Sequence, residues 1–160
     1  MSDQRIVRVH LDGESLMRLS PLLEADRDRA VADLTADNRF APAARRRGQS
    51  PASGPFVLHL SIQEGRLVLD IRRADDSPLM AVGLALGPFR RLMKDYRLLV
   101  DSHVTALQEG REARIQAIDM GRRGLHNEGA TLLMQRLAGK IDIDLDTARR
   151  LFTLLCVLHQ

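Results

Sequence analysis

The chain has little sulfur and few aromatic rings. It contains one cysteine, Cys156, and no tryptophan, and aromatic residues make up 3% of its 160 residues. A single thiol excludes an internal disulfide and a zinc site built from several thiolates. With so few aromatic rings, the core has to be built from leucine, isoleucine, valine, alanine and methionine.

Long apolar runs are also missing. The longest strongly apolar stretch, Leu151 to Leu158, is far shorter than the ~20 residues of a membrane-spanning helix. Residues 1–5 lack the apolar segment of a secretory signal. Together with the lone cysteine, these features predict a cytoplasmic protein and do not favour a membrane partner.

The charged residues are dominated by arginine. Of the 24 basic residues 22 are arginine, and the formal net charge is +3. Arginine stays charged and offers a planar donor fork that suits carboxylates and phosphates, although a coding bias towards arginine codons would produce the same count. A net charge this small does not by itself indicate a nucleic-acid binder.

Hydrophobic alternation predicts strands in the first half of the chain. We expect a short strand over residues 5–11 and further strands over 56–63, 67–71 and 79–86. Glu64-Gly65 has the form of a two-residue hairpin turn. The last three strands therefore predict a three-stranded antiparallel β-meander.

A helix and a loop precede the meander. Ser20 and Pro21 have the residue types of a helix N-cap and first helical position, and the helix is expected to end near Asp37. The segment 41–55 combines proline, glycine and serine with Arg45–Arg47, which predicts an exposed, flexible basic loop. The triplet lacks interleaved aromatic residues for stacking on bases, so a solvated loop is favoured over a phosphate clamp.

The second half of the chain reads as helical. Four helices are expected, over residues 88–110, 112–120, 128–138 and 147–159. The predicted fold class is α+β: an N-terminal strand and helix, the three-stranded meander, and a four-helix C-terminal half packed on the sheet. At this length the hydrophobic content of 44% suits one core, so a single domain is expected over residues 1–160.

Polar residues gather between the second and third of these four helices. The segment from Asp119 to Gly129 contains three glycines. Gly121 or Gly124 would end one helix in the left-handed conformation, and Asn127 would cap the next. Such a structural joint explains every residue of the segment except His126.

An anion site is the second interpretation of this segment. Arg122, Arg123 and His126 would lie beside the free N–H groups at the start of the next helix, where a phosphate or carboxylate binds favourably. No phosphate-binding or dinucleotide-binding glycine motif occurs in the chain, so no cofactor is expected.

Catalysis and RNA binding are two further interpretations. Asp119, His126 and Glu128 could supply a base and its orienting carboxylate, but no serine or cysteine nucleophile signature accompanies them. Gly121–Gly124 has the form of the basic G-x-x-G loop with which KH domains clamp nucleic acid. Asn127 stands where an apolar residue is expected, and the order of elements differs, so nucleic acid is not favoured.

Four segments of the chain resemble a known family. They are Ile118–Gly129 (IDMGRRGLHNEG), Asp146–His159 (DTARRLFTLLCVLH), Gly87–Arg91 (GPFRR) and Lys94–Tyr96 (KDY). They resemble the uncharacterised protein family 0262, whose members are small bacterial proteins. The likeness extends over nearly the whole chain, but it implies no activity, substrate, cofactor or site residue.

The sequence favours a non-enzymatic binding or regulatory protein that recognises an anionic small molecule or protein partner. A small hydrolase or transferase acting on a phosphorylated substrate is the alternative, RNA binding is the third candidate, and a homo-oligomer remains open. No pair of histidines has metal-binding helical spacing, so no metal site is expected. The candidate ligand site consists of Asp119, Arg122, Arg123, His126, Asn127 and Glu128.

Overall fold

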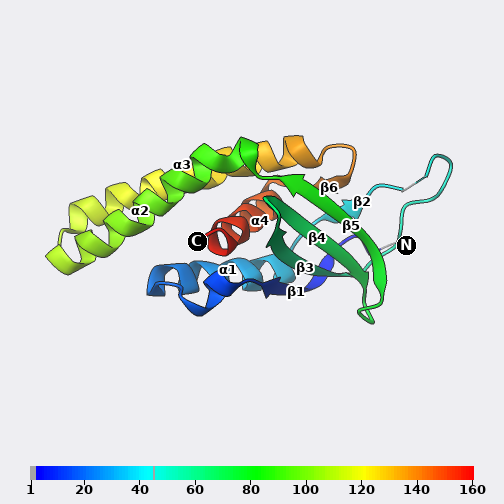
Figure 1. Cartoon of the computed structure of the whole chain (residues 1–160), viewed down its shortest axis with the longest axis horizontal. Helices are drawn as coiled ribbons and strands as arrows, with labels where there is room; N and C mark the ends of the chain where they lie inside the picture. Colours follow the sequence, from blue (N-terminus) through cyan, green and yellow to red (C-terminus); the bar gives the residue numbers. More distant parts are fainter. Residues whose placement is uncertain (1–2, 45) are drawn as a thin grey trace.

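The computed structural model describes residues 3–44 and 46–160, so Arg45 of the predicted basic loop lies outside the described residues. Strands make up most of the first half of the chain, and helices dominate the second (Figure 1). The elements are β1 (Ile6–Asp12), a short 3-10 helix η1 (Glu14–Met17), α1 (Pro21–Ala36), β2 (Phe40–Pro42), β3 (Phe56–Gln63), β4 (Arg66–Arg73), β5 (Pro78–Ala85), a second 3-10 helix η2 (Gly87–Phe89), α2 (Arg90–Glu109), α3 (Glu112–Leu137), β6 (Ile141–Ile143) and α4 (Leu145–Leu158).

The predicted antiparallel meander is confirmed and forms most of a four-stranded sheet. The strand order is β1-β3-β4-β5, and β3, β4 and β5 pair antiparallel. Glu64 and Gly65 form the hairpin turn with φ of 52° and 72°, the left-handed values that a two-residue turn of this kind requires. β1 pairs parallel with β3, so the sheet is mixed. The short strands β2 and β6 form a separate antiparallel pair.

The helices cover one face of the sheet (Figure 1). α4 lies at the centre of this layer and contacts α1 and α3. Every residue of α4 from Leu151 to Leu158 is buried, as its apolar composition predicts. Asp144 caps the helix by accepting a hydrogen bond from the backbone N–H of Thr147 at 2.9 Å. The C-terminal half therefore packs on the sheet around a helix whose last two turns are buried on every side.

The predicted joint between Asp119 and Gly129 is wrong, because this segment lies inside one continuous helix. α3 runs unbroken through 26 residues, so the C-terminal half contains three α-helices rather than four. Asn127 caps no helix, and its carbonyl accepts a hydrogen bond from the Thr131 hydroxyl one turn later. Neither Gly121 nor Gly124 has a positive φ.

Packing explains why the glycines do not end α3. A glycine costs about 1 kcal/mol relative to alanine inside a helix, but α3 packs against both α2 and α4. A Cβ atom on Gly129 would lie 2.5 Å from the ring of the buried Phe152, and one on Gly121 would lie 3.6 Å from Leu99. At Gly129 the absent side chain thus permits close contact with α4.

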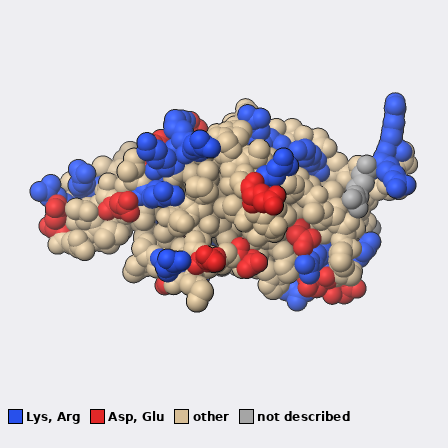
Figure 2. Space-filling view, in the orientation of Figure 1, with Lys and Arg blue, Asp and Glu red and all other residues tan. Residues whose placement is uncertain are grey.

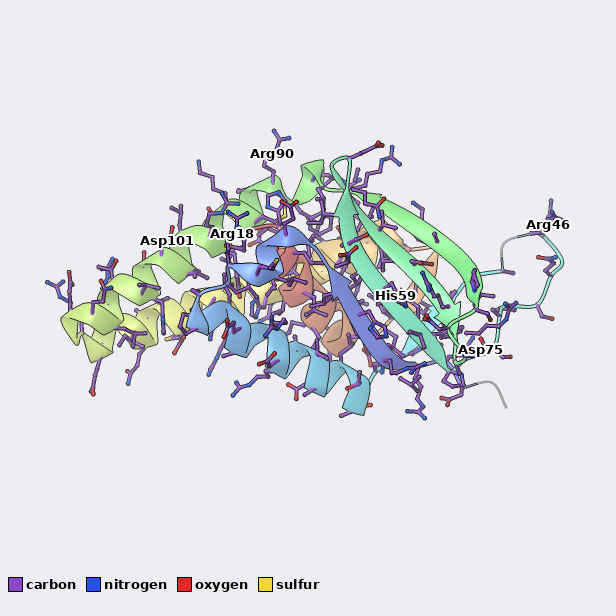
Figure 3. The ribbon with its side chains drawn as sticks, turned by 60° about the horizontal axis from the view of Figure 1, so that its bottom comes forward. Arg18, Arg46, His59, Asp75, Arg90 and Asp101 are labelled. Atoms are coloured by element: carbon purple, nitrogen blue, oxygen red, sulfur yellow. The ribbon has the colours of Figure 1, made fainter. Side chains whose placement is uncertain are left out.

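Two features extend beyond the main body at opposite ends (Figure 1). At one end the α2–α3 hairpin projects, turning at Gly110 with a left-handed φ of 67°. At the other end lies the predicted loop, where residues 46–51 are exposed and basic side chains stand out in Figure 2. Arg46 is labelled on this loop in Figure 3.

Two glycine substitutions test whether α3 is continuous. Gly129→Ala should destabilise the protein by ~1–3 kcal/mol, because the new methyl group overlaps a rigid buried ring. Gly124→Ala should stabilise it by up to about 1 kcal/mol, because alanine is the better helix former and nothing lies within 4 Å of the added Cβ.

Urea unfolding of both variants measures these effects. Destabilisation by Gly124→Ala would contradict a helical segment and favour a left-handed turn at this position.

Candidate functional site

An ion pair between α1 and α3 lies at the centre of the candidate site. The Arg122 guanidinium donates from one nitrogen to both oxygens of Asp26, at 2.8 and 2.9 Å. The two side chains are 20% and 14% exposed, so the pair is largely shielded from water. A second nitrogen of Arg122 reaches Asp119 at 3.3 Å.

Asp26 also binds α2. The hydroxyl of Tyr96 donates a hydrogen bond to the same carboxylate. Tyr96 is fully buried, and this burial, reinforced by Asp26, raises the pKa of its hydroxyl above the usual value. The hydroxyl therefore stays protonated and acts as a donor. One carboxylate thus connects three helices.

His126 packs against this network. Its ring stacks on that of Tyr96 at a centroid distance of 5.4 Å and meets Phe152 edge-on at 6.3 Å. Burial lowers the pKa of His126 to about 4, with Arg122 and Arg149 adding to the effect and Asp26 opposing it. The imidazole is therefore neutral at pH 7. Its Nε2 atom is buried and has no hydrogen-bond partner among the described residues.

A pocket of about 430 Å³ opens beside these side chains, between α1, α3 and α4. Each helix lines the pocket with residues at i, i+3, i+4 and i+7, which is the spacing of one helical face. In each of the three faces the first residue is an aspartate, and an arginine follows three residues later. The faces are Asp26, Arg29, Ala30 and Asp33 on α1; Asp119, Arg122, Arg123 and His126 on α3; and Asp146, Arg149, Arg150 and Thr153 on α4.

The aspartate and arginine of this repeat form an ion pair with each other on two of the three helices. On α3 and α4 the two residues pair within the helix, Asp119 with Arg122 at 3.3 Å and Asp146 with Arg149 at 3.1 Å. On α1 the aspartate instead binds Arg122 and Tyr96 across the helix layer, so it does not pair with Arg29.

Three charged groups of the pocket remain available. Within residues 3–44 and 46–160, no hydrogen bond or ion pair engages the side chains of Arg29, Asp33 or Arg123, and all three are exposed. Arg150, by contrast, donates to the carbonyl of Asp37 at 2.8 Å. Five arginines and four aspartates line the pocket in total.

The structure brings together four of the six predicted site residues. Asp119, Arg122, Arg123 and His126 line the pocket. Asn127 is exposed and does not line it, and Glu128 forms an ion pair with Arg91 of α2 outside the pocket. The predicted anion site at a helix N-terminus is wrong, since no helix begins here, but the arginines and the histidine do share one face.

The sequence interpretation missed the walls contributed by α1 and α4. The available signal was the i, i+3, i+4, i+7 spacing of polar residues, which recurs from Asp26, Asp119 and Asp146. On a helix mostly buried by leucine, such a polar face at Asp146–Thr153 indicates that something polar lies opposite. No local pattern indicates, however, that the three faces converge.

Two other reactive side chains, His59 and Cys156, do not line the pocket. His59, labelled in Figure 3, is on the sheet and stacks on His10 with ring centroids 4.6 Å apart. Its Nε2 is 2.8 Å from Asp76. Cys156 is fully buried within α4, and this burial raises the pKa of its thiol.

These features define an α+β protein in which a mixed sheet supports a helical layer with an arginine-lined pocket. The chain belongs to the uncharacterised protein family UPF0262, whose sequence model matches residues 3–160. Among the described residues, no helix has both the length and the apolar character needed to cross a membrane.

Relatives of the same family name come from several bacteria. A UPF0262 protein of Granulibacter bethesdensis is 66% identical, with 99% of this chain and 92% of the relative covered. Those of Acidiphilium cryptum and Maricaulis maris are 58% and 50% identical, with 98% and 99% of this chain and 93% and 96% of the relatives covered. No solved structure matches the chain significantly.

The buried imidazole predicts a loss of stability in mild acid. Unfolded histidine has a pKa of about 6.5, whereas His126 in the folded protein titrates at about 4. Between these values the unfolded chain gains a proton that the folded protein does not. The contribution of His126 to the free energy of unfolding is therefore fully present above about pH 6.5. It decreases by ~3 kcal/mol as the pH falls to 4.

Urea unfolding at a series of pH values measures this loss, and His126→Phe is the matched control. Phenylalanine retains a ring to stack on Tyr96 but cannot titrate, so the variant should lose less stability over the same pH interval. An NMR titration that places the pKa of His126 near 6.5 would contradict a buried imidazole.

Proposed function

We propose that this protein is a non-enzymatic binding or regulatory protein that recognises an anionic ligand, or an anionic group of a protein partner, in the pocket between α1, α3 and α4. The observation that carries the proposal is that the aspartate–arginine pair found on α3 and α4 does not form on α1. Because Asp26 is engaged by Arg122 and Tyr96, Arg29 lacks the aspartate that its counterparts on α3 and α4 have.

The arrangement of charges supports an anionic ligand. The pocket carboxylates Asp26, Asp119 and Asp146 are already bound to arginines. Arg29 and Arg123 come from different helices and have no such partner in the described part of the chain. An arginine fork binds carboxylate or phosphate oxygens in a bidentate manner, so one anion between these helices would engage both.

The size and rigidity of the pocket support a small organic ligand. Its volume of about 430 Å³ falls within the ~300–1,000 Å³ typical of small-molecule sites. Arg122 is held in place by two carboxylates, so part of the wall is ordered before a ligand arrives. Preorganisation of this kind lowers the entropy cost of binding.

The proposal places the protein in the cytoplasm, where phosphorylated and carboxylated metabolites are abundant.

Substitution of the two available arginines tests the proposal. A ligand at about 100 times its Kd stabilises a folded protein by ~2.7 kcal/mol, which raises the melting temperature. Pyrophosphate, malate and glycerol 3-phosphate serve as probes, and at least one should raise it. The double variant Arg29→Ala/Arg123→Ala should abolish this rise, whereas Arg114→Ala, an exposed site on α3 away from the pocket, should retain it.

The double variant is expected to fold, because neither side chain makes a hydrogen bond or ion pair with the described residues. Its stability without ligand should change by about 0.5 kcal/mol or less. A full melting shift in the double variant, or no shift with any probe in the wild type, would contradict the proposed anion site.

A second candidate function is hydrolysis or transfer of a phosphoryl group with His126 as base. A perturbed imidazole beside a concave pocket favours it. His126→Gln should then abolish turnover of a phosphate monoester such as p-nitrophenyl phosphate, and the wild-type rate should rise through a pKa near 4. Equal background hydrolysis by both proteins would remove this candidate.

A further inference from the structure

The α1 wall of the pocket carries a donor and an acceptor that do not pair with each other. Arg29 and Asp33 are four residues apart, the spacing at which opposite charges on a helix usually interact. Both are exposed and both line the pocket, yet no ion pair joins them. The wall therefore offers a guanidinium and a carboxylate one helical turn apart.

The carboxylate limits which anions suit the site. A carboxylate only accepts hydrogen bonds, so a phosphate or carboxylate ligand with no donor of its own would meet repulsion from Asp33 while binding Arg29. A ligand that also carries a hydroxyl or ammonium group converts this repulsion into a hydrogen bond. Side chains one turn apart have Cβ atoms ~5–6 Å apart, so the hydroxyl or ammonium group should lie close to the anionic group of the ligand.

The α3 wall offers a further polar group of a suitable kind. His126 lines the pocket and is neutral; its Nε2 is buried, so the other ring nitrogen is the one left to face a ligand. A neutral imidazole donates from one nitrogen and accepts at the other. It thus adds hydrogen-bonding capacity to the wall without adding charge, which suits an uncharged polar group better than a second anion.

We propose, on the basis of the proposed anion-binding function, that the ligand is a small organic anion bearing a hydroxyl or ammonium group close to its anionic group. Arg29 and Arg123 bind the phosphate or carboxylate, and Asp33 accepts from the neighbouring donor. Hydroxy acids, polyol phosphates and phosphorylated amino acids share this chemistry, whereas simple anions do not.

Calorimetric titration with matched probes tests this ligand class. Glycerol 3-phosphate is compared with propyl phosphate, and malate with succinate, since the members of each pair differ in their hydroxyl groups. In at least one pair the hydroxylated member should bind about tenfold more tightly. Phosphoserine, which carries an ammonium group, distinguishes an amine donor from a hydroxyl donor.

Asp33→Ala provides the decisive variant. It should weaken binding of the hydroxylated member and strengthen binding of its unsubstituted partner, because one carboxylate leaves the pocket, so the affinity ratio should fall to about one. Asp28→Ala, on α1 but outside the pocket, is the control and should leave the ratio unchanged. A purely structural role for Asp33 would not shift the two affinities in opposite directions.

The outcomes separate this inference from the proposed function. Equal affinity within both pairs, with binding lost in Arg29→Ala/Arg123→Ala, would overturn the ligand class and leave the anion site standing. No binding of any probe would overturn both. An unchanged affinity ratio in Asp33→Ala would overturn the role of Asp33.

Discussion

The helical layer depends on one shielded carboxylate. Asp26 accepts hydrogen bonds from Arg122 of α3 and from Tyr96 of α2, while its own backbone belongs to α1. A charged group removed from water is costly unless every lone pair is satisfied, so these partners fix how the three helices approach one another. Because Asp26 binds Arg122 and Tyr96, it does not pair with Arg29 on its own helix. The charge available to a ligand is therefore a consequence of how the layer is held together.

The strands and turns could be predicted from the sequence because their signals are local. Alternation along β3 and β4 and the pair Glu64-Gly65 predicted the hairpin that the structure shows. The parallel pairing of β1 was not predicted, because it joins residues about 50 positions apart whose alternation suits either direction. The break at Gly121 and Gly124 was predicted wrongly, because glycine propensity is weak compared with packing on both sides of α3.

The candidate site was predicted in part for a related reason. Residue type identified Arg122, Arg123 and His126, and the structure places them on one face of α3 in place of the predicted turn. Asn127 was included as the cap of a helix and Glu128 as an orienting carboxylate, but α3 is continuous and directs both away from the pocket. Asp26 and Asp33 could not be assigned to the site from the chain alone, because their role arises from the meeting of α1 with α3 and α4.

Because the α2–α3 hairpin projects, the two ends of α3 differ in how far they are buried. Near Gly129, α3 is pressed against Phe152 in the buried layer, whereas around residues 112–117 it is mostly exposed and beyond the reach of α4 (Figure 1). Backbone amides in the outer part should exchange with solvent by local opening, and those in the inner part only when most of the protein unfolds. Arg122 lies between these two parts of α3, so its wall of the pocket lies where exchange by local opening should give way to exchange by global unfolding.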